Sequence, residues 1–206
     1  MQAFHFDTID STNDQAKRLV AEDRIADAAL VTARAQTAGR GSRGRSWVSP
    51  RDAGLYLSVV DVRTGDPSVD LTLFTLAAGV ACVEVLRDTV GVDVAIKPVN
   101  DLIVDGRKLG GILTEAVVEQ QVARAVVTGI GVNVRSANRP VRSQAVEPVA
   151  LQALLPAPAF AHLDVDSIAL RLAERVLAWN RLVWTSDAAR VRAAWAEHVV
   201  PTERRA

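Results

Sequence analysis

Two long apolar runs near the middle of the chain constrain its fold more than any other feature. Residues 102–119 and residues 121–134 both favour β-strands, and the turn pair Asp105-Gly106 interrupts the first run. An Asp-Gly pair between apolar runs is a strong hairpin signal, because both positions of the tight turn require positive φ. The second run alternates before it becomes rich in glycine. We therefore expect a meander of antiparallel strands.

Strands and helices on both sides of this meander complete the pattern. Ser11 or Thr12 can cap a helix, and Asp14 or Gln15 lies three residues further on to complete a capping box. Residues 70–90 have helical spacing and are apolar on most faces, which predicts a buried helix. The other expected elements are strands at residues 3–9, 28–36, 54–62 and 93–97, helices at residues 10–23, 164–184 and 187–200, and a short helix near residues 149–155 within the loop-rich segment 136–158.

This order of elements predicts an α+β fold, in which a mixed, largely antiparallel sheet carries helices on one face. Hydrophobic residues make up 49% of the chain and charged residues 23%, so there is enough apolar material for a core. We expect one domain over residues 1–200 and a short tail at residues 201–206. The exposed face of the sheet could pair two subunits as a homodimer.

Composition and charge exclude several classes of protein. No apolar run is long enough to span a bilayer, and the N-terminus lacks the basic and apolar regions of a secretory signal. We therefore expect a cytoplasmic protein without a membrane partner. The 24 basic and 24 acidic residues cancel, which disfavours a general nucleic-acid binder. The single cysteine, Cys82, lies in an apolar segment and is interpreted as a buried core residue.

The loop at residues 33–52 gathers positive charge in an otherwise neutral chain. No acid lies between Asp27 and Asp52, whereas the segment holds five arginines: Arg34, Arg40, Arg43, Arg45 and Arg51. Arginines without neighbouring acids should repel one another, so we expect the loop to stay mobile until an anion binds.

Glycines within this loop indicate what the anion would be. Gly39, Gly41 and Gly44 allow backbone amides to approach a ligand closely, and the interspersed arginines can bind phosphate oxygens. A nucleoside triphosphate is the favoured ligand. A solvated basic loop and an RNA contact are alternatives, although Trp47 offers only one aromatic platform for a base.

Two further segments carry polar residues beside glycines inside predicted strands. Lys108 precedes Gly110 and Gly111, and could reach a carboxylate or phosphate at a reacting centre. Asn133 follows Gly129 and Gly131 and offers both a donor and an acceptor. A hairpin with a surface lysine and a strand that ends in a turn are the simpler interpretations. Asp101 and Asp105 could help to hold Mg²⁺ with nucleotide phosphates, and Asp101 is the better candidate.

Five motifs in order resemble those of the biotin protein ligase family: "DSTNDQ", "QTAGRGSRGRSW", "IKPVND", "RKLGGILTE" and "GIGVNV". The resemblance covers residues 4–134 and implies the biotin/lipoate ligase-like catalytic fold. It also implies a two-step reaction, in which biotin and ATP form biotinyl-5′-AMP and a lysine of a carboxyl-carrier protein then accepts biotin. ATP with Mg²⁺ would be the co-substrate.

The resemblance also implies roles for individual residues. Lys108 and Arg40 would be catalytic, and Asp101 would contact Mg²⁺. The residues that would bind biotin are Ser11, Thr12, Asn13, Gln36, Gly39, Arg40, Lys108, Gly110, Gly111, Ile112 and Leu113. Those that would bind the nucleotide are Arg43, Arg45, Trp47, Lys97, Asn100, Asp101 and Asn133.

Several departures from the family pattern leave other functions open. Ser42 replaces the second arginine of the loop motif, and Pro98-Val99 replaces Trp-Pro after Lys97. The motifs begin too early for an N-terminal DNA-binding domain, and the usual C-terminal β-barrel is not evident. A lipoate or octanoate ligase or transferase, and a homologue that binds biotin without completing transfer, are the alternatives.

Overall fold

The structure of the 206-residue chain is a computed structural model that describes residues 1–66, 70–137, 146–185 and 187–200. The expected tail at residues 201–206 lies outside the described residues. The elements, in chain order, are β1 (Gln2–Ile9), α1 (Thr12–Ala21), β2 (Ala28–Gln36), the 3-10 turn η1 (Ser42–Gly44), β3 (Gly54–Asp66), α2 (Leu71–Val90), β4 (Ala95–Lys97), β5 (Asp101–Val104), β6 (Arg107–Glu119), β7 (Val122–Asn133), α3 (Leu151–Leu154), α4 (Ala157–Ala161), α5 (Val165–Trp184) and α6 (Ala188–Ala196).

The seven strands form one mixed sheet in the order β1-β2-β3-β7-β6-β5-β4. Only the pair β1–β2 is parallel among the described strands, and the predicted meander is confirmed by the antiparallel neighbours β5, β6 and β7. The two residues that join β5 to β6, Asp105 and Gly106, have φ of 49° and 72°. Both values match the tight hairpin turn that an Asp-Gly pair favours.

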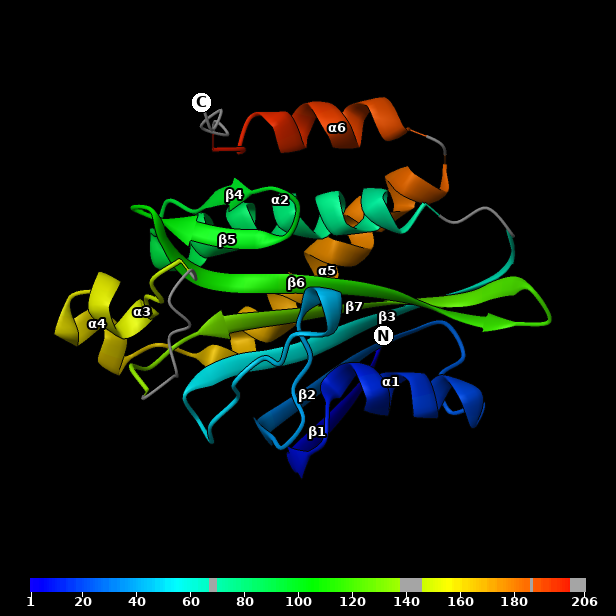
Figure 1. Cartoon of the computed structure of the whole chain (residues 1–206), viewed down its shortest axis with the longest axis horizontal. Helices are drawn as coiled ribbons and strands as arrows, with labels where there is room; N and C mark the ends of the chain where they lie inside the picture. The colour runs from blue at the N-terminus through cyan, green and yellow to red at the C-terminus, as the bar shows by residue number, and fades with distance from the viewer. Residues whose placement is uncertain (67–69, 138–145, 186, 201–206) are drawn as a thin grey trace.

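Apolar residues alternate between the two faces of the sheet and form a separate cluster on each. Leu57, Val59 and Ile130 pack with α2 and α5, whereas Val31 and Val60 pack with α1. Because successive strand residues point to opposite faces, α1 lies on the face opposite α2 and α5. Figure 1 shows α1 in front of the sheet and α2 and α5 behind it. The α+β class is confirmed, and α1 adds cover on a second face that the sequence did not indicate.

Local sequence signals account for where the helices begin and end. Ser11 is the N-cap of α1, and its side chain accepts a hydrogen bond from the backbone N–H of Asp14 at 3.4 Å. Helix α2 begins after the N-cap Asp70 and ends at Gly91, which has a φ of 67°. Helix α4 was not expected, because its first residues fall in the segment predicted to be mostly loop. Residues 138–145 of that segment lie outside the described part.

The buried helix α2 contains the single cysteine at a fully buried position. Burial raises the pKa of the Cys82 thiol to about 12, which confirms that this residue behaves as a small core side chain. Within the described residues, no helix combines the length and apolar character that a membrane span requires.

Candidate functional site

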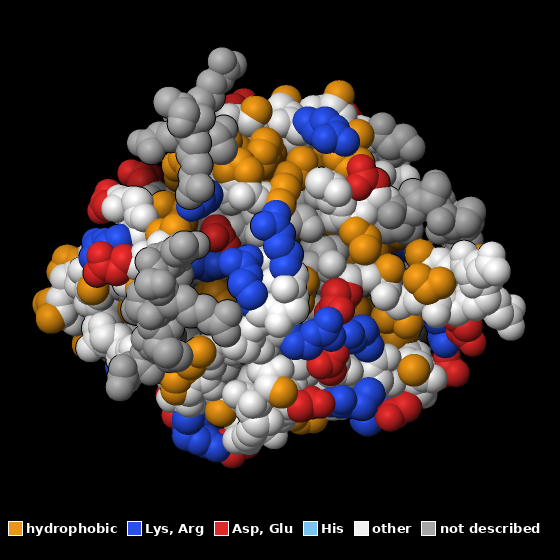
Figure 2. Space-filling model, in the orientation of Figure 1, with side chains coloured by type: hydrophobic (Ala, Val, Ile, Leu, Met, Phe, Trp, Pro, Cys, Tyr) orange, Lys and Arg blue, Asp and Glu red, His pale blue; other side chains and the backbone are white. Residues whose placement is uncertain are grey.

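A cavity of about 280 Å³ opens on the face of the sheet that carries α1. The lining side chains come from the start of α1, the end of β2, the arginine loop, the turn before β5, and strands β6 and β7. Of the residues predicted for the site, those that line the cavity are Ser11, Thr12, Asn13, Gln36, Arg40, Arg45, Trp47, Asn100, Asp101, Lys108, Gly111, Ile112, Leu113 and Asn133. All five sequence motifs therefore meet at one place. Figure 2 shows Lys and Arg side chains gathered near the centre of this face.

Four predicted residues do not line the cavity: Gly39, Arg43, Lys97 and Gly110. Lys97 and Arg43 are exposed. A Cβ atom at Gly110 would meet Leu102, a core residue of the opposite face, because Gly110 and Gly111 point to opposite sides of β6. Gly39 packs against the carbonyl oxygen of Trp47, which a Cβ atom there would approach to 2.4 Å.

Glycines on β6 and β7 form the floor of the cavity. A Cβ atom at Gly131 would lie 2.6 Å from the Trp47 indole, and one at Gly129 would lie 2.3 Å from Asn13 Oδ1. A Cβ at Gly111 would lie 3.5 Å from the same indole, in ordinary contact. The missing side chains lower the surface of the sheet, so Trp47 and Asn13 can lie directly against its backbone.

The start of α1 is joined to the arginine loop through Gln36. The Gln36 Oε1 accepts hydrogen bonds from the backbone N–H and the hydroxyl of Thr12, at 2.8 and 3.2 Å. The amide nitrogen of Gln36 donates to Ser49 Oγ at 2.7 Å, and Ser49 donates to the Trp47 carbonyl at 3.1 Å. This series of hydrogen bonds fixes the position of α1 relative to Trp47 and Ser49 in the arginine loop.

Asn13 connects α1 to β6 and β3. Its Nδ2 donates to Glu115 Oε2 at 2.8 Å and to the Leu113 carbonyl at 3.2 Å, while its Oδ1 accepts from Ser58 Oγ at 2.6 Å. The side chain is buried, and these contacts engage both ends of its amide. Asn13 therefore supports the cavity wall, a role beyond the ligand contact that was expected.

Lys108 and Asp101 form an ion pair at the edge of the cavity. The Lys108 Nζ lies 2.5 Å from Asp101 Oδ1, and the two side chains are 23% and 18% exposed. The same Nζ lies 5.6 Å from the centroid of the Trp47 ring. The hairpin at Asp105-Gly106 brings the partners together, since Lys108 and Asp101 are seven residues apart on paired strands. A lysine held in this way keeps a directed positive charge beside the glycine floor.

Asn133 and Asn100 hold the backbone around Lys108. Asn133 Nδ2 donates to the carbonyls of Lys108 at 3.2 Å and Val149 at 3.0 Å. Its Oδ1 is buried and has no hydrogen-bond partner among the described residues. Asn100 Nδ2 donates to the Ile112 carbonyl at 2.8 Å. Asn133 thus combines a structural role with a free acceptor in the wall of the cavity.

The arginine loop is paired with acids from distant parts of the chain. Arg40 contacts Asp14 and Glu115, Arg51 contacts Asp7, and Arg34 contacts Asp52. The expectation that the loop arginines lack acidic partners is therefore wrong for these three. Asp52 lies at the end of the loop itself, whereas folding supplies the other carboxylates from β1, α1 and β6. Arg45 instead donates to Ser42 Oγ at 2.8 Å.

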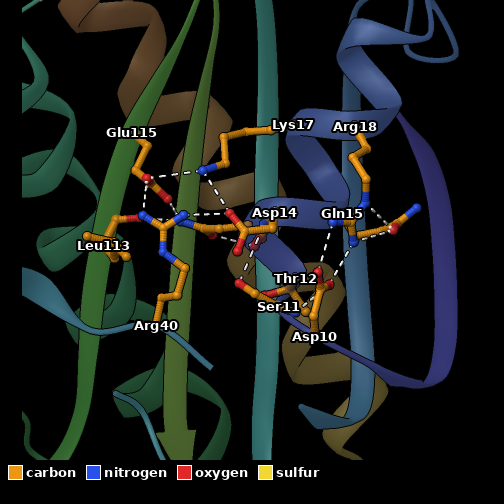
Figure 3. A network of polar contacts seen from close by, with 12 residues as sticks. Asp10, Ser11, Thr12, Asp14, Gln15, Lys17, Arg18, Arg40, Leu113 and Glu115 are labelled. Carbon is orange, nitrogen blue, oxygen red and sulfur yellow. Dashed lines mark hydrogen bonds and ion pairs between the residues drawn. The ribbon is translucent and has the colours of Figure 1, made fainter. Parts of the chain in front are cut away.

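Asp14, Lys17 and Glu115 belong to the neighbourhood of the cavity but were not predicted. Figure 3 shows them around the Arg40 guanidinium. Burial alone would raise the pKa of the Asp14 carboxyl, but the hydrogen bonds from Lys17 and Arg40 outweigh it and lower the pKa. Glu115 could have been predicted from the alternation of side chains along a strand. Gly111, Leu113 and Glu115 are two residues apart and therefore lie on one face of β6.

Comparisons with known proteins agree with this geometry. The model of the Biotin/lipoate A/B protein ligase family matches residues 5–133. A biotin–[acetyl-CoA-carboxylase] ligase from Paracoccus denitrificans is 33% identical over 189 residues, which cover 90% of this chain and 76% of that relative. The bifunctional ligase/repressor BirA of Bacillus subtilis is 37% identical over 130 residues, or 63% of this chain and 39% of BirA.

The fold also matches solved structures. The biotin protein ligase from Aquifex aeolicus in complex with biotin and ATP superimposes with a TM-score of 0.76 at 20% identity, covering 97% of this chain and 78% of that one. The aligned region spans less than two fifths of the first curated relatives, at 39% of their length. The match to the family model covers more than half of the chain, and the chain belongs to the biotin/lipoate A/B protein ligase family.

Proposed function

We propose that this protein is an ATP-dependent biotin protein ligase. It would form biotinyl-5′-AMP from biotin and ATP, and then transfer biotin to a lysine of a carboxyl-carrier protein in the cytoplasm. The observation that carries the proposal is that the Lys108–Asp101 pair, the glycine floor and the arginine loop meet in one cavity. Relatives named as biotin–[acetyl-CoA-carboxylase] ligases support biotin as the acid.

The cavity suits a small ring with an aliphatic tail and a carboxylate. Ser11 and Thr12 at the start of α1 provide polar groups for a ureido ring, and Gln36 is already oriented beside them. Gly111 and Leu113 provide an apolar floor for the tail. Sites for small molecules are mostly apolar with a few placed polar groups, as here.

Lys108 would act on the adenylation step. A carboxylate oxygen of biotin attacks the α-phosphorus, a mixed anhydride forms, and the bond to the β-phosphate breaks with the electron pair leaving on pyrophosphate. Both reactants are anions, so fixed cations are needed to offset their repulsion and the charge of the transition state. Lys108 supplies such a cation, and Asp101 fixes its direction in the ligand-free protein.

The nucleotide would lie between the arginine loop and the turn that precedes β5. Trp47, Asn100 and Asn133 line this part of the cavity, and the free Asn133 Oδ1 can accept one hydrogen bond from a ligand. Arg43 and Arg45 would approach the phosphates from the loop, and Lys97 from the rim. We extend the Lys97 and Arg43 assignments from the family resemblance, because both side chains lie outside the cavity lining.

Magnesium would enter this site with the nucleotide. The described residues contain no group of three or more His, Cys, Asp or Glu side chains that could hold a metal ion. Mg²⁺ commonly binds one or two carboxylates together with substrate phosphates, and the single carboxylate of Asp101 fits that pattern. When bound, the ion would offset phosphate charge.

The second step, transfer of biotin to the carrier lysine, requires that the loop exclude water from the adenylate. The amine of the carrier lysine attacks the acyl carbon of the adenylate, and AMP leaves with the electron pair of the broken C–O bond. Water would compete as a nucleophile unless it is excluded. The arginine loop lies in front of β6 and β7, where it can shield this carbon (Figure 1).

Biotin-dependent exchange of labelled pyrophosphate into ATP tests this proposal. The expected result is exchange with biotin and none with lipoate or octanoate. Exchange with lipoate would assign the protein to the other branch of the family. Tight biotin binding without exchange would leave a binding protein and would contradict the proposed chemistry.

A further inference from the structure

Arg40 differs from the other two arginines at the centre of the loop, because its guanidinium contacts two carboxylates. Its Nη1 donates to Asp14 Oδ1 at 2.5 Å, and its Nη2 donates to Glu115 Oε1 at 2.6 Å. Arg43 and Arg45 contact no carboxylate in the described part of the chain. Figure 3 shows the Arg40 side chain crossing from the loop to α1 and β6.

The group around Arg40 is balanced in charge and well connected. Lys17 Nζ lies 2.8 Å from Asp14 and 3.2 Å from Glu115, so two cations face two carboxylates. Asn13 donates to the second oxygen of Glu115 at 2.8 Å. The four charged side chains are 19–39% exposed, and partly buried pairs are screened by salt less than surface pairs are. This arrangement holds Arg40 without any ligand.

The backbone of the loop forms a small hairpin above this group. The N–H of Gly41 donates to the Arg45 carbonyl at 2.7 Å, and the N–H of Trp47 donates to the Gly39 carbonyl at 2.8 Å. Arg40 pairs with Ser46 as an isolated bridge. We call residues 39–41 and 45–47 the stem, and Ser42–Gly44 the tip. One side of the stem is attached through Arg40, and the other rests through Trp47 on Gly131.

We infer that Asp14 and Glu115 are positioning residues that anchor the stem through Arg40, and that the phosphate-binding charge of the loop belongs to Arg43 and Arg45. Arg43 projects from the tip with a φ of 57°, and Arg45 joins the tip to the stem. If Arg40 turned to a phosphate, Asp14 and Glu115 would keep only Lys17 as a cation in a partly buried site, which is costly. This role differs from the catalytic and biotin-binding roles that the family resemblance implies for Arg40.

Limited proteolysis of the ligand-free protein tests the anchor, because trypsin cuts after arginine and the tip carries its sites. Cleavage after Arg43 and Arg45 would be followed by mass spectrometry. Glu115→Gln weakens one charge-assisted contact of Arg40 and should make local opening, and hence cleavage, about tenfold faster. Arg40→Gln removes the contacts to both Asp14 and Glu115 and should accelerate cleavage by at least that factor. Glu119→Gln is the matched control, since it makes the same change on the same strand at a 61% exposed residue.

A double-mutant cycle separates the anchor from general loosening of the protein. If Glu115 acts on the stem only through Arg40, Arg40→Gln combined with Glu115→Gln is cleaved about as fast as Arg40→Gln alone. Arg40→Lys keeps one cation and should restore part of the protection. Unchanged cleavage in both single variants, or rate effects that multiply independently, would overturn the inference. Arg40→Gln changes an exposed loop residue, so it tests the anchor even if Glu115→Gln fails to fold.

The division of roles among the arginines has its own measurement, which rests on the proposed function. Arg45→Gln should raise the KM for ATP in pyrophosphate exchange and change cleavage after Arg43 only slightly, because Arg45 contacts Ser42 within the tip but no carboxylate outside it. Arg40→Gln should change cleavage by the larger factor. Equal cleavage effects for the two variants would contradict the division. The proteolysis needs no ligand, so its outcome stands whether or not the protein adenylates biotin.

Discussion

The two faces of β6 and β7 are built from alternating residues with opposite properties. Ile112, Ile130 and Val132 point to the face of α2 and α5 and are buried in the larger core. Gly111 and Gly131 point to the other face and leave room for Trp47. One strand pair therefore supplies apolar volume to the core on one side and empty space to the cavity on the other. Residues that stabilise the core and residues that shape the cavity are therefore direct neighbours in the sequence.

Neighbouring residues on β6 give the strongest test of this separation. Leu109 is fully buried in the larger core, so Leu109→Ala should lower the free energy of unfolding by about 2–5 kcal/mol. Urea denaturation followed by circular dichroism would measure this change. A loss below about 1 kcal/mol would mean that the core face tolerates voids, and the contrast between the faces would weaken.

Lys108, one residue earlier, should show the opposite behaviour. Lys108→Ala should raise the barrier to adenylation by about 3 kcal/mol or more, because it removes a cation from the transition state. Pyrophosphate exchange measures this effect, and the free energy of unfolding should change less than in Leu109→Ala, because only a partly exposed ion pair is lost. Near-normal exchange would remove Lys108 from the proposed mechanism.

Gly131 tests the need for space on the cavity face. The added Cβ of Gly131→Ala would lie 2.6 Å from the Trp47 indole, and overpacking of this kind costs about 1–3 kcal/mol unless the ring moves. We expect the ring to move, which would shift the NMR resonance of the Trp47 indole N–H. Ile130→Val, on the core face, is the control and should leave that resonance in place. An unshifted signal in Gly131→Ala would show that the cavity floor accepts a methyl group without moving Trp47, which would contradict the need for glycine there.

Charges on the rim of the cavity face should contribute the least to stability. Hydrogen bonds from Arg18 lower the pKa of Asp10 from 3.8 to about 2. A carboxyl with a lowered pKa stabilises the fold above pH 3.8, and this contribution is lost as the pH falls towards 2. The pair is more than 40% exposed, so Asp10→Asn should cost only about 0.2–1 kcal/mol near neutral pH. The difference should shrink in thermal melts as the pH falls from 3.8 through about 2, and a constant difference would contradict the assignment.

Features that depend on neighbouring residues could be predicted from the sequence. The hairpin at Asp105-Gly106, the cap at Ser11 and the long buried helix α2 all follow from local pattern and turn chemistry. The five motifs likewise indicated most of the residues that line the cavity.

Features that depend on distant residues could not be predicted in this way. Arg40 lies 26 residues from Asp14 and 75 from Glu115, so inspection of the loop alone suggested unpaired charge. Helix α1 was placed with the other helices, because its apolar residues do not reveal which face of the sheet they meet. Pairing across such separations is decided by the order of strands in the finished sheet.

The two-residue hairpin between β5 and β6 also affects the order in which the contacts of the site form during folding. Hairpins form in about 1–10 μs, and the Lys108–Asp101 pair spans only this turn. The contact between Arg40 and Glu115 must wait until the sheet has closed from β2 to β6, because contacts between distant residues form slowly. Lys108 and Asp101 can therefore pair before Arg40 reaches Glu115, and only the completed fold brings the arginine loop to the same cavity.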